Sequence, residues 1–389
     1  MPGDPRYADI DRVVEGEGPR GRSIVEALAR KIKLSDRSVT QFVTAGRGAG
    51  LTTELNRLAE YLGRKDAANL LAVRVDAGQY LDLSSPIEPF DILIAIVAAV
   101  DEAMDVRGAP SRTPVMSRMW DRLVREIRTD VPVMPKLGLQ LRLNRPLRDQ
   151  IHKATAAHSS ELFHEIRDAL FLQRQTAREL GYAGLVVLFD DLNRLSGMRS
   201  NVDEVTASVE RVLFASHMFE LPAHIVLTLP VWAAFIPASA LQSVAIVPMI
   251  MVCQRDGSVL DPGRRAVREI IHSRFPQHCI EEVLGPDLDD RIERIARWSG
   301  GVPRAVVRLL RELVLEAELL PIADADFRRV LAQITEPVRR LLSVEDARYL
   351  RRVLADSPPH AGRNFVELLA NGALLPYQEG DLWFGVHPG

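Results

Sequence analysis

The stretch "TAGRGAGLTTEL" at residues 44–55 constrains the fold more than any other part of this sequence. The apolar run "TQFV" comes directly before it, and the amphipathic pattern "TTELNRLAEYL" continues from it. A buried strand that ends in a glycine-rich turn and leads into a helix is typical of phosphate-binding loops. In such loops the backbone N–H groups and the positive end of the helix dipole face the anion. The stretch therefore predicts an α/β fold with an anion-binding loop.

The loop departs from the usual phosphate-binding pattern at one position. In G-x-x-x-x-G-K-[ST], the lysine contacts the terminal phosphates and the hydroxyl group holds Mg²⁺. Aligned on that pattern, Ala45 replaces the first glycine, Gly50 matches the second, Leu51 replaces the lysine and Thr52 supplies the hydroxyl. A charged contact of this kind contributes about 1.5–3 kcal/mol to binding, and its loss lowers a catalytic rate by about 10²–10³. We therefore expect nucleotide binding with weak or absent hydrolysis.

The substitution Leu51→Lys would restore the missing group. We expect it to raise the affinity for ATP by about 1.5–3 kcal/mol if the remaining site is intact, with little or no turnover. If Leu51 is instead packed into a collapsed loop, the lysine is buried without a partner and the variant loses stability.

Five short apolar runs predict the strands of a parallel sheet. They cover residues 40–46, 70–78, 184–191, 223–230 and 244–252. Helical patterns separate them at residues 52–62, 87–104, about 147–180 and 203–219. Strands that alternate with helices indicate an α/β core, in which we expect the strand before the glycine-rich loop to be central.

The run "LVVLFDD" ends in two adjacent carboxylates, Asp190 and Asp191. An apolar strand with acids at its carboxyl end is the form of the strand that orients Mg²⁺ beside a bound nucleotide. Asp190 is the candidate for holding Mg²⁺ together with Thr52, and Asp191 is the candidate for positioning an attacking water. Both acids are therefore candidate catalytic residues.

The C-terminal third of the chain reads as helical, with "PGRRAVREIIHSRF" and "LDDRIERIARWSGGVPRAVVRLLRELVLEA". Two further helical segments follow residue 335, and then two extended runs flank a turn at Glu379-Gly380-Asp381. Helix, helix and hairpin predict a small winged-helix domain. Its expected core is Phe365, Leu368, Leu369 and Trp383.

The predicted organisation is an N-terminal segment at 1–20, a P-loop α/β domain at 21–255, a helical lid at 256–334 and a winged helix at 335–389. An arm at about 131–145 is inserted into the α/β domain.

The order of these motifs resembles the AAA+/STAND superfamily of P-loop NTPases. In particular, "AGRGAGLTTEL" and "VDAGQYLDLSSPIEPFDIL" are similar to "GPRGSGKSTEL" and "VDAxxYLxLSxPIExxDLL" of bacterial AAA-type ATPases. The ending "LLANGALLPYQEGDLWFGVHP" also resembles the winged-helix terminus of that group. The resemblance implies a five-stranded AAA+-like parallel sheet, a helical lid, and an ATP-dependent regulatory or signalling switch with a degenerate Walker A loop.

The resemblance also implies which residues contact ATP or ADP with Mg²⁺. Thr228 matches the polar sensor at the end of the fourth strand, and Arg304 in "GGVPR" matches the lid arginine that senses nucleotide. Arg274 in "HSRF" is a weaker candidate for an arginine that faces nucleotide or a neighbouring subunit. The candidate loop residues are Gly46, Arg47, Gly48, Ala49, Gly50, Leu51, Thr52 and Thr53.

Composition argues against several other classes of protein. The formal net charge of −3 does not favour a general nucleic-acid binder, and Cys253, Cys279 and the nine histidines show no metal-ligand spacing. The apolar stretch 90–104 is too short to span a bilayer comfortably, and the first residues lack the pattern of a signal peptide. We therefore expect a cytoplasmic protein with no metal besides nucleotide-bound Mg²⁺.

Two alternatives to a nucleotide switch remain open. The first is a nucleotide-free pseudo-ATPase scaffold, or a subunit that pairs with an active AAA-type homologue. The second is a DNA-binding adaptor that uses a basic stripe in and after the inserted arm, although residues 372–389 of the winged helix contain no lysine or arginine. The stripe consists of Lys136, Arg142, Arg145, Arg148 and Lys153.

Overall fold

The computed structural model describes residues 23–109, 159–195, 201–236, 243–316, 319–355 and 362–388. The N-terminal segment, the inserted arm and the basic stripe predicted from the sequence lie outside these residues. The chain forms two units, each described below by itself. The sheet unit comprises Val25–Thr44 and Leu55–Ala245, and the loop unit comprises Met1–Ile24, Ala45–Glu54 and Ile246–Gly389.

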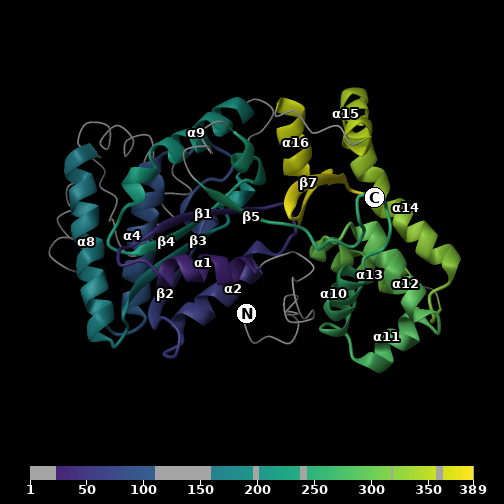
Figure 1. Cartoon of the computed structure of the whole chain (residues 1–389), viewed down its shortest axis with the longest axis horizontal. Helices are drawn as coiled ribbons and strands as arrows, with labels where there is room; N and C mark the ends of the chain where they lie inside the picture. Colours follow the sequence, from purple (N-terminus) through teal and green to yellow (C-terminus); the bar gives the residue numbers. More distant parts are fainter. Residues whose placement is uncertain are drawn as a thin grey trace, which may run out of the picture. The chain divides into compact units, whose positions relative to one another are not determined.

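A five-stranded sheet forms the centre of the sheet unit, in the order β2-β3-β4-β1-β5 (Figure 1). Its strands are β1 (Thr40–Ala45), β2 (Leu70–Asp76), β3 (Gly184–Asp190), β4 (His224–Leu229) and β5 (Val244–Val247). The pairs β1–β4, β2–β3 and β3–β4 are parallel, which confirms the predicted parallel sheet.

Two details of the predicted sheet are wrong. The central strand is β4, and β1 lies between β4 and β5. The lengths and apolar patterns of the strands do not specify their neighbours, so the sequence could not decide this order. Strand β5 ends at Val247 instead of residue 252, and the following residue, Pro248, lacks the N–H that would continue the ladder.

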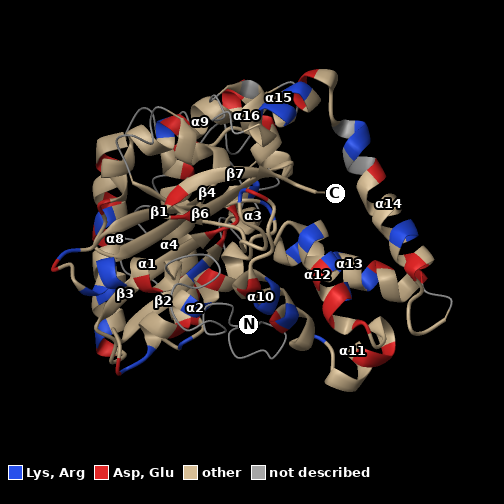
Figure 2. Cartoon of the chain, turned by 45° about the vertical axis from the view of Figure 1, so that its right-hand side comes forward, with Lys and Arg blue, Asp and Glu red and all other residues tan. Residues whose placement is uncertain are grey.

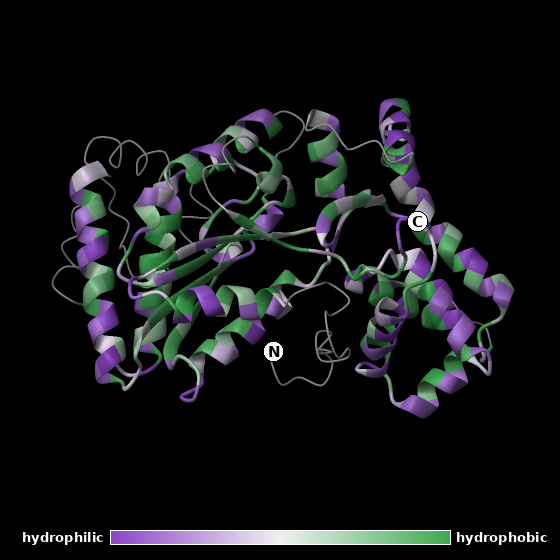
Figure 3. Ribbon diagram, viewed as in Figure 1, coloured by the Kyte–Doolittle hydropathy of each residue, from purple (hydrophilic) through white to green (hydrophobic). Residues whose placement is uncertain are grey.

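Helices cover the sheet as the alternating pattern predicts. They are α1 (Ile24–Lys33), α2 (Leu51–Gly63), the short α3 (Ala77–Tyr80), α4 (Pro89–Asp105), α8 (Ser159–Glu179) and α9 (Val202–Phe214). Helix α4 is apolar and buried along most of its length, and it contacts β2, β3 and α8 (Figure 3). None of the described helices is both long enough and apolar enough to cross a membrane.

Three of the five strands carry no charged side chains. Strands β1, β4 and β5 carry no Lys, Arg, Asp or Glu, whereas the helices carry many (Figure 2). His224, at the start of β4, accepts a hydrogen bond at Nδ1 from the Val39 N–H at 3.2 Å. Burial, with a smaller contribution from Arg174, lowers the pKa of His224 to about 4. The imidazole is therefore neutral at pH 7.

The loop unit is mainly helical. Helices α10 (Asp261–His272), α11 (Gln277–Leu284), α12 (Leu288–Ser299), α13 (Pro303–Glu316) and α14 (Asp324–Leu341) share one apolar core. The core includes Ile271, Ile295, Leu309 and Phe327. These helices have apolar residues on one face and charged residues on the other, which explains why they pack together through that face.

The C-terminal part has the predicted order of helix, helix and hairpin. Helices α15 (Val344–Leu354) and α16 (Arg363–Asn371) precede the antiparallel strands β6 (Leu374–Glu379) and β7 (Asp381–Val386). Gly380 makes the turn with φ +69°. Of the expected core residues, Phe365, Leu368 and Leu369 are buried. Trp383 is only half-buried and stacks on Tyr377, with 4.7 Å between ring centroids.

Candidate functional site

The loop between β1 and α2 is a tight turn that depends on glycine. Gly48 and Gly50 have φ angles of +88° and +93°, a region that side chains other than glycine rarely adopt. The Ala49 N–H donates to the Gly46 carbonyl at 3.1 Å, and the Thr53 N–H donates to the Gly50 carbonyl at 2.9 Å. The first N–H groups of a helix have no acceptor within it. The start of α2 therefore offers N–H donors and a positive dipole end to an anion.

Helix α13 packs directly on this loop within the loop unit. The Arg304 N–H donates to the Gly48 carbonyl at 3.3 Å. A Cβ atom at Gly48 would lie 2.9 Å from Arg304 Cβ and 3.0 Å from Val302 Cγ1. The Arg304 side chain is exposed, so its guanidinium group is open to a ligand. The structure thus brings together the candidate loop residues and the candidate lid arginine.

The C-terminal hairpin also touches the loop. A Cβ atom at Gly46 would lie 2.5 Å from Met249 Cε and 3.3 Å from Pro376 Cδ. The Met249 N–H donates to the Pro376 carbonyl at 2.9 Å, and the buried Tyr377 hydroxyl donates to the Gly300 carbonyl at 2.6 Å. The loop, the segment before α13 and strand β6 are therefore joined by contacts that exclude side chains from both glycines. These contacts could not be predicted from local patterns, because the partners are far apart along the chain.

The side chains along the loop differ in exposure. Arg47 and Thr52 are exposed, and Thr53 is half-buried. Leu51, at the position of the usual lysine, is 4% exposed. A leucine packed in this way offers no charge to a phosphate. The loop therefore supplies backbone donors and a hydroxyl group at α2, and no ammonium group.

The two acids at the end of β3 have different surroundings. Asp190 is buried, its Oδ1 accepts the Asp191 N–H at 2.7 Å, and its Oδ2 lies 3.8 Å from an Arg74 nitrogen. Asp191 has the left-handed φ of +70°, and its Oδ2 accepts a hydrogen bond from Arg194 at 3.2 Å. Asp190 is thus fixed and partly neutralised, whereas Asp191 already has a cationic partner that competes with water.

Thr228 lies beside Asp190 in the sheet. Phe189 pairs with Leu227 in register, so the next residues along β3 and β4 are Asp190 and Thr228. Thr228 is fully buried, and its Oγ1 has no hydrogen-bond partner. A buried hydroxyl without a partner costs about 1–3 kcal/mol unless water or a ligand satisfies it. This orphaned group fits a site that receives a polar ligand.

The sequence interpretation missed one acid at this edge of the sheet. Asp76 pairs in register with Asp190 across β2 and β3. Asp76, Asp190 and Thr228 therefore occupy the carboxyl ends of three neighbouring strands. The "VDAG" sequence, with an acid directly after an apolar run, was a signal that could have identified it. Arg274, the weaker candidate, donates from Nη1 to the Ile270 carbonyl at the end of α10 at 3.1 Å.

The residues present fit a nucleotide with Mg²⁺ only in part. In the loop unit, the α2 N-terminus, Thr52 and Arg304 suit phosphate and metal. In the sheet unit, Asp190 and Thr228 offer a carboxylate and an orphaned hydroxyl group. The position of the lysine does not fit, because Leu51 is buried. Among the described residues, no cluster of His, Cys, Asp and Glu forms a separate metal site.

The comparisons with known proteins concern the fold. No protein-family model matches the sequence, and no characterised protein is significantly similar to it. The crystal structure of Cdc6p from Pyrobaculum aerophilum is similar with a TM-score of 0.39 and 12% sequence identity, covering 97% of this chain and 93% of that chain. At this level of similarity the comparison adds nothing to the observed architecture, a five-stranded sheet with parallel strand pairs and covering helices. The α/β class with a five-stranded parallel sheet, predicted from the sequence, is confirmed.

Proposed function

We propose that this chain is a STAND-like regulatory switch that binds ATP or ADP with Mg²⁺ through a degenerate Walker A loop and hydrolyses ATP weakly or not at all. The observation that carries the proposal is the direct packing of the loop on two other parts of the loop unit. Gly48 contacts Arg304 of α13, and Gly46 contacts Pro376 of the hairpin. A ligand that adjusts the loop backbone must therefore also displace or tighten these contacts.

Each group of the proposed site has a distinct task. In the loop unit, the N–H groups at the start of α2 and the Arg304 guanidinium would bind phosphate oxygens, and the Thr52 hydroxyl would be a ligand for Mg²⁺. In the sheet unit, Asp190 would offer a carboxylate to Mg²⁺. The bound metal supplies positive charge that neutralises the phosphates. Thr228 donates its orphaned hydroxyl to a polar group or to water. All of these groups bind or orient the nucleotide and its metal ion.

Two features oppose efficient hydrolysis. Leu51 brings no charge to the terminal phosphates, and one such stabilising group typically contributes about 10²–10³ to the rate. The Asp191 carboxylate accepts a hydrogen bond from Arg194, so it is a poor partner for an attacking water. We therefore infer a site that reads nucleotide and does not turn it over efficiently.

The experiment is calorimetric titration of the full chain with MgATP and with ADP. We expect weak, metal-dependent binding that Thr52→Ala reduces about tenfold, the worth of a charge-assisted contact. Thr206→Ala on α9 is the matched control, because that hydroxyl donates to the Val202 carbonyl of its own helix at 2.9 Å. Phosphate release should stay at background in every variant.

A nucleotide-free scaffold is the second candidate, and the burial of Leu51 favours it. It would act through protein partners, such as an AAA-type subunit with an intact loop. Absence of any heat change at millimolar nucleotide would reject the switch and leave the scaffold. The proposal of a DNA-binding adaptor depends on the basic stripe that lies outside the described residues, so nothing in the structure adds support to it.

A further inference from the structure

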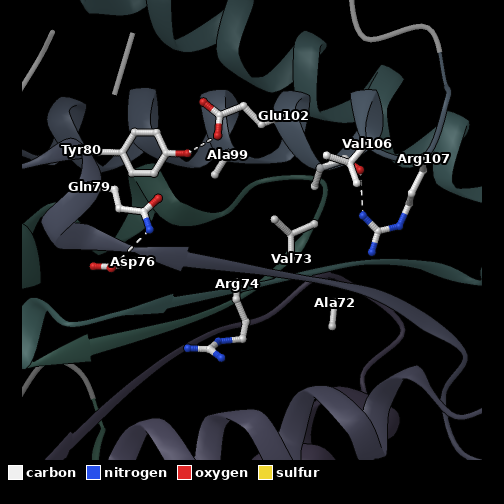
Figure 4. Close-up of a pocket in the computed structure, with 11 residues that line it drawn as sticks. Ala72, Val73, Arg74, Asp76, Gln79, Tyr80, Ala99, Glu102, Val106 and Arg107 are labelled. Carbon is white, nitrogen blue, oxygen red and sulfur yellow. Dashed lines mark hydrogen bonds between the residues drawn. The ribbon is translucent and has the colours of Figure 1, made fainter. Parts of the chain in front are cut away.

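A pocket of about 460 Å³ lies along β2, between that strand and α4 (Figure 4). Its apolar wall includes Ala72, Val73 and Ala99, and its polar residues include Asp76, Glu102 and Arg107. All of these residues belong to the sheet unit. Asp76 also lies beside Asp190 in the sheet, but none of these residues has a task in the proposed nucleotide binding.

In the described part of the chain, β2 is an outer strand that pairs only with β3, through the whole run from Leu70 to Asp76. An outer strand presents unpaired N–H and C=O groups along its free side. Proteins usually protect such an edge with proline, a bulge or several charges. Here the strand "LLAVRVD" is regular, has no proline and has Arg74 as its only internal charge.

The ends of the pocket carry opposite charges. At the carboxyl end of β2, Asp76 lies near Tyr80, whose hydroxyl donates to Glu102 Oε2 at 2.9 Å (Figure 4). Burial, and to a lesser extent the hydrogen bond to Glu102, raise the pKa of Tyr80. The phenol therefore stays protonated and keeps the Glu102 carboxylate in place.

The other end of the pocket is cationic. Arg107 lies just beyond α4, is exposed, and donates from Nη1 to the Ala103 carbonyl at 2.7 Å. Figure 4 shows it on the side of the pocket where Ala72 lies, away from Asp76. Residues 72 and 76 of a strand are about 13 Å apart at about 3.3 Å per residue. A cation and an anion with about this separation would complement the two ends.

We propose that the β2 edge binds an extended segment of a partner protein by strand addition. The segment carries a lysine or arginine that meets Asp76 and Glu102, and an acidic residue about four positions away that meets Arg107. Backbone hydrogen bonds to β2 provide the affinity, and the two charged ends select the sequence. This interaction does not require nucleotide binding.

The test uses the full chain and a synthetic peptide. The peptide alternates threonine and valine, carries one lysine and one glutamate about four positions apart, and bears a fluorescent label for anisotropy. We expect a dissociation constant below about 100 µM at moderate ionic strength. Glu102→Gln should weaken binding about two- to fivefold and Arg107→Glu about fivefold or more. Glu60→Gln on the exposed face of α2 is the matched control and should have no effect.

Two altered peptides separate strand addition from nonspecific attraction. N-methylation of alternate peptide groups removes backbone donors and should weaken binding by more than about tenfold. Replacement of the lysine by glutamate should also weaken it and should abolish the effect of Glu102→Gln. Equal binding of the methylated peptide would overturn the proposal. So would no binding to the unaltered chain, including the case in which another part of this chain already covers β2.

Discussion

Leu51→Lys places a positive charge where phosphate-binding loops usually have one. In this protein Leu51 is 4% exposed, so the new side chain replaces a packed leucine. Loss of a fully buried leucine removes about 1.5–3 kcal/mol of transfer free energy, and an ammonium group buried without a partner adds a further cost of several kcal/mol. Since lysine can extend its charged end toward water, we expect a net loss of about 3 kcal/mol in the free energy of unfolding.

The assay is thermal unfolding of the parent and the variant, with and without MgATP. A loss of about 3 kcal/mol corresponds to a fall in apparent Tm of about 6–12 °C for a unit of this size. Leu51→Met is the matched control, because it keeps an apolar side chain of similar volume and should cost less than about 1.5 kcal/mol. We expect no larger ATP-dependent rise in Tm for the lysine variant than for the parent.

One result would refute this reasoning. If Leu51→Lys melts at or above the temperature of the parent, and ATP raises its Tm more than that of the parent, then position 51 faces the ligand and the loop accepts a lysine. That outcome would favour the other expectation, in which the rest of the site is intact and only the lysine charge is missing.

Three further predictions concern other contacts. Gly48→Ala forces a Cβ into a left-handed residue 2.9 Å from Arg304 Cβ, so we expect a loss of about 2–4 kcal/mol by chemical denaturation, whereas alanine at the open Gly257 should cost only the backbone part. Tyr377→Phe leaves the Gly300 carbonyl without its donor and should cost about 1–2 kcal/mol, measured in the same way. The pKa of His224 is about 4, below its ordinary 6.5, so the unfolded state binds the extra proton and stability should fall as the pH drops from 6.5 to 4. His224→Asn keeps a hydrogen-bond acceptor and should reduce the loss of stability between pH 6.5 and 4 by about 2 kcal/mol. An unchanged dependence of stability on pH in this variant would show that His224 does not cause the loss.

Much of the sheet unit could be predicted from the sequence, because its strands are short apolar runs between clear turn and helix signals. The turn at Gly380, the buried helix α4 and the strand that ends in Asp190 all follow from local patterns. The amphipathic helix α1 (Ile24–Lys33) was not predicted from the sequence. Its apolar pattern covers only ten residues, which is too short for periodicity alone to identify a helix.

The candidate site was harder to predict, because its chemistry depends on contacts between distant residues. The identity of Leu51 is visible in the sequence, but its burial is not. The neighbours of Gly46 and Gly48 are Pro376 and Arg304, and no local pattern connects them. The place of Asp76 beside Asp190 depends on the pairing of β2 with β3, which the sequence does not specify.

The contacts of the glycine loop can form only late in the synthesis of the chain. The loop at Gly46 precedes Pro376 of strand β6 by several hundred residues. During synthesis from the N-terminus, the loop leaves the ribosome long before β6 exists, and contacts between such distant positions form late. A nascent or truncated chain that stops before Leu374 therefore carries a loop without its native neighbours, and ligand binding measured on such a fragment describes a different loop from that of the finished protein.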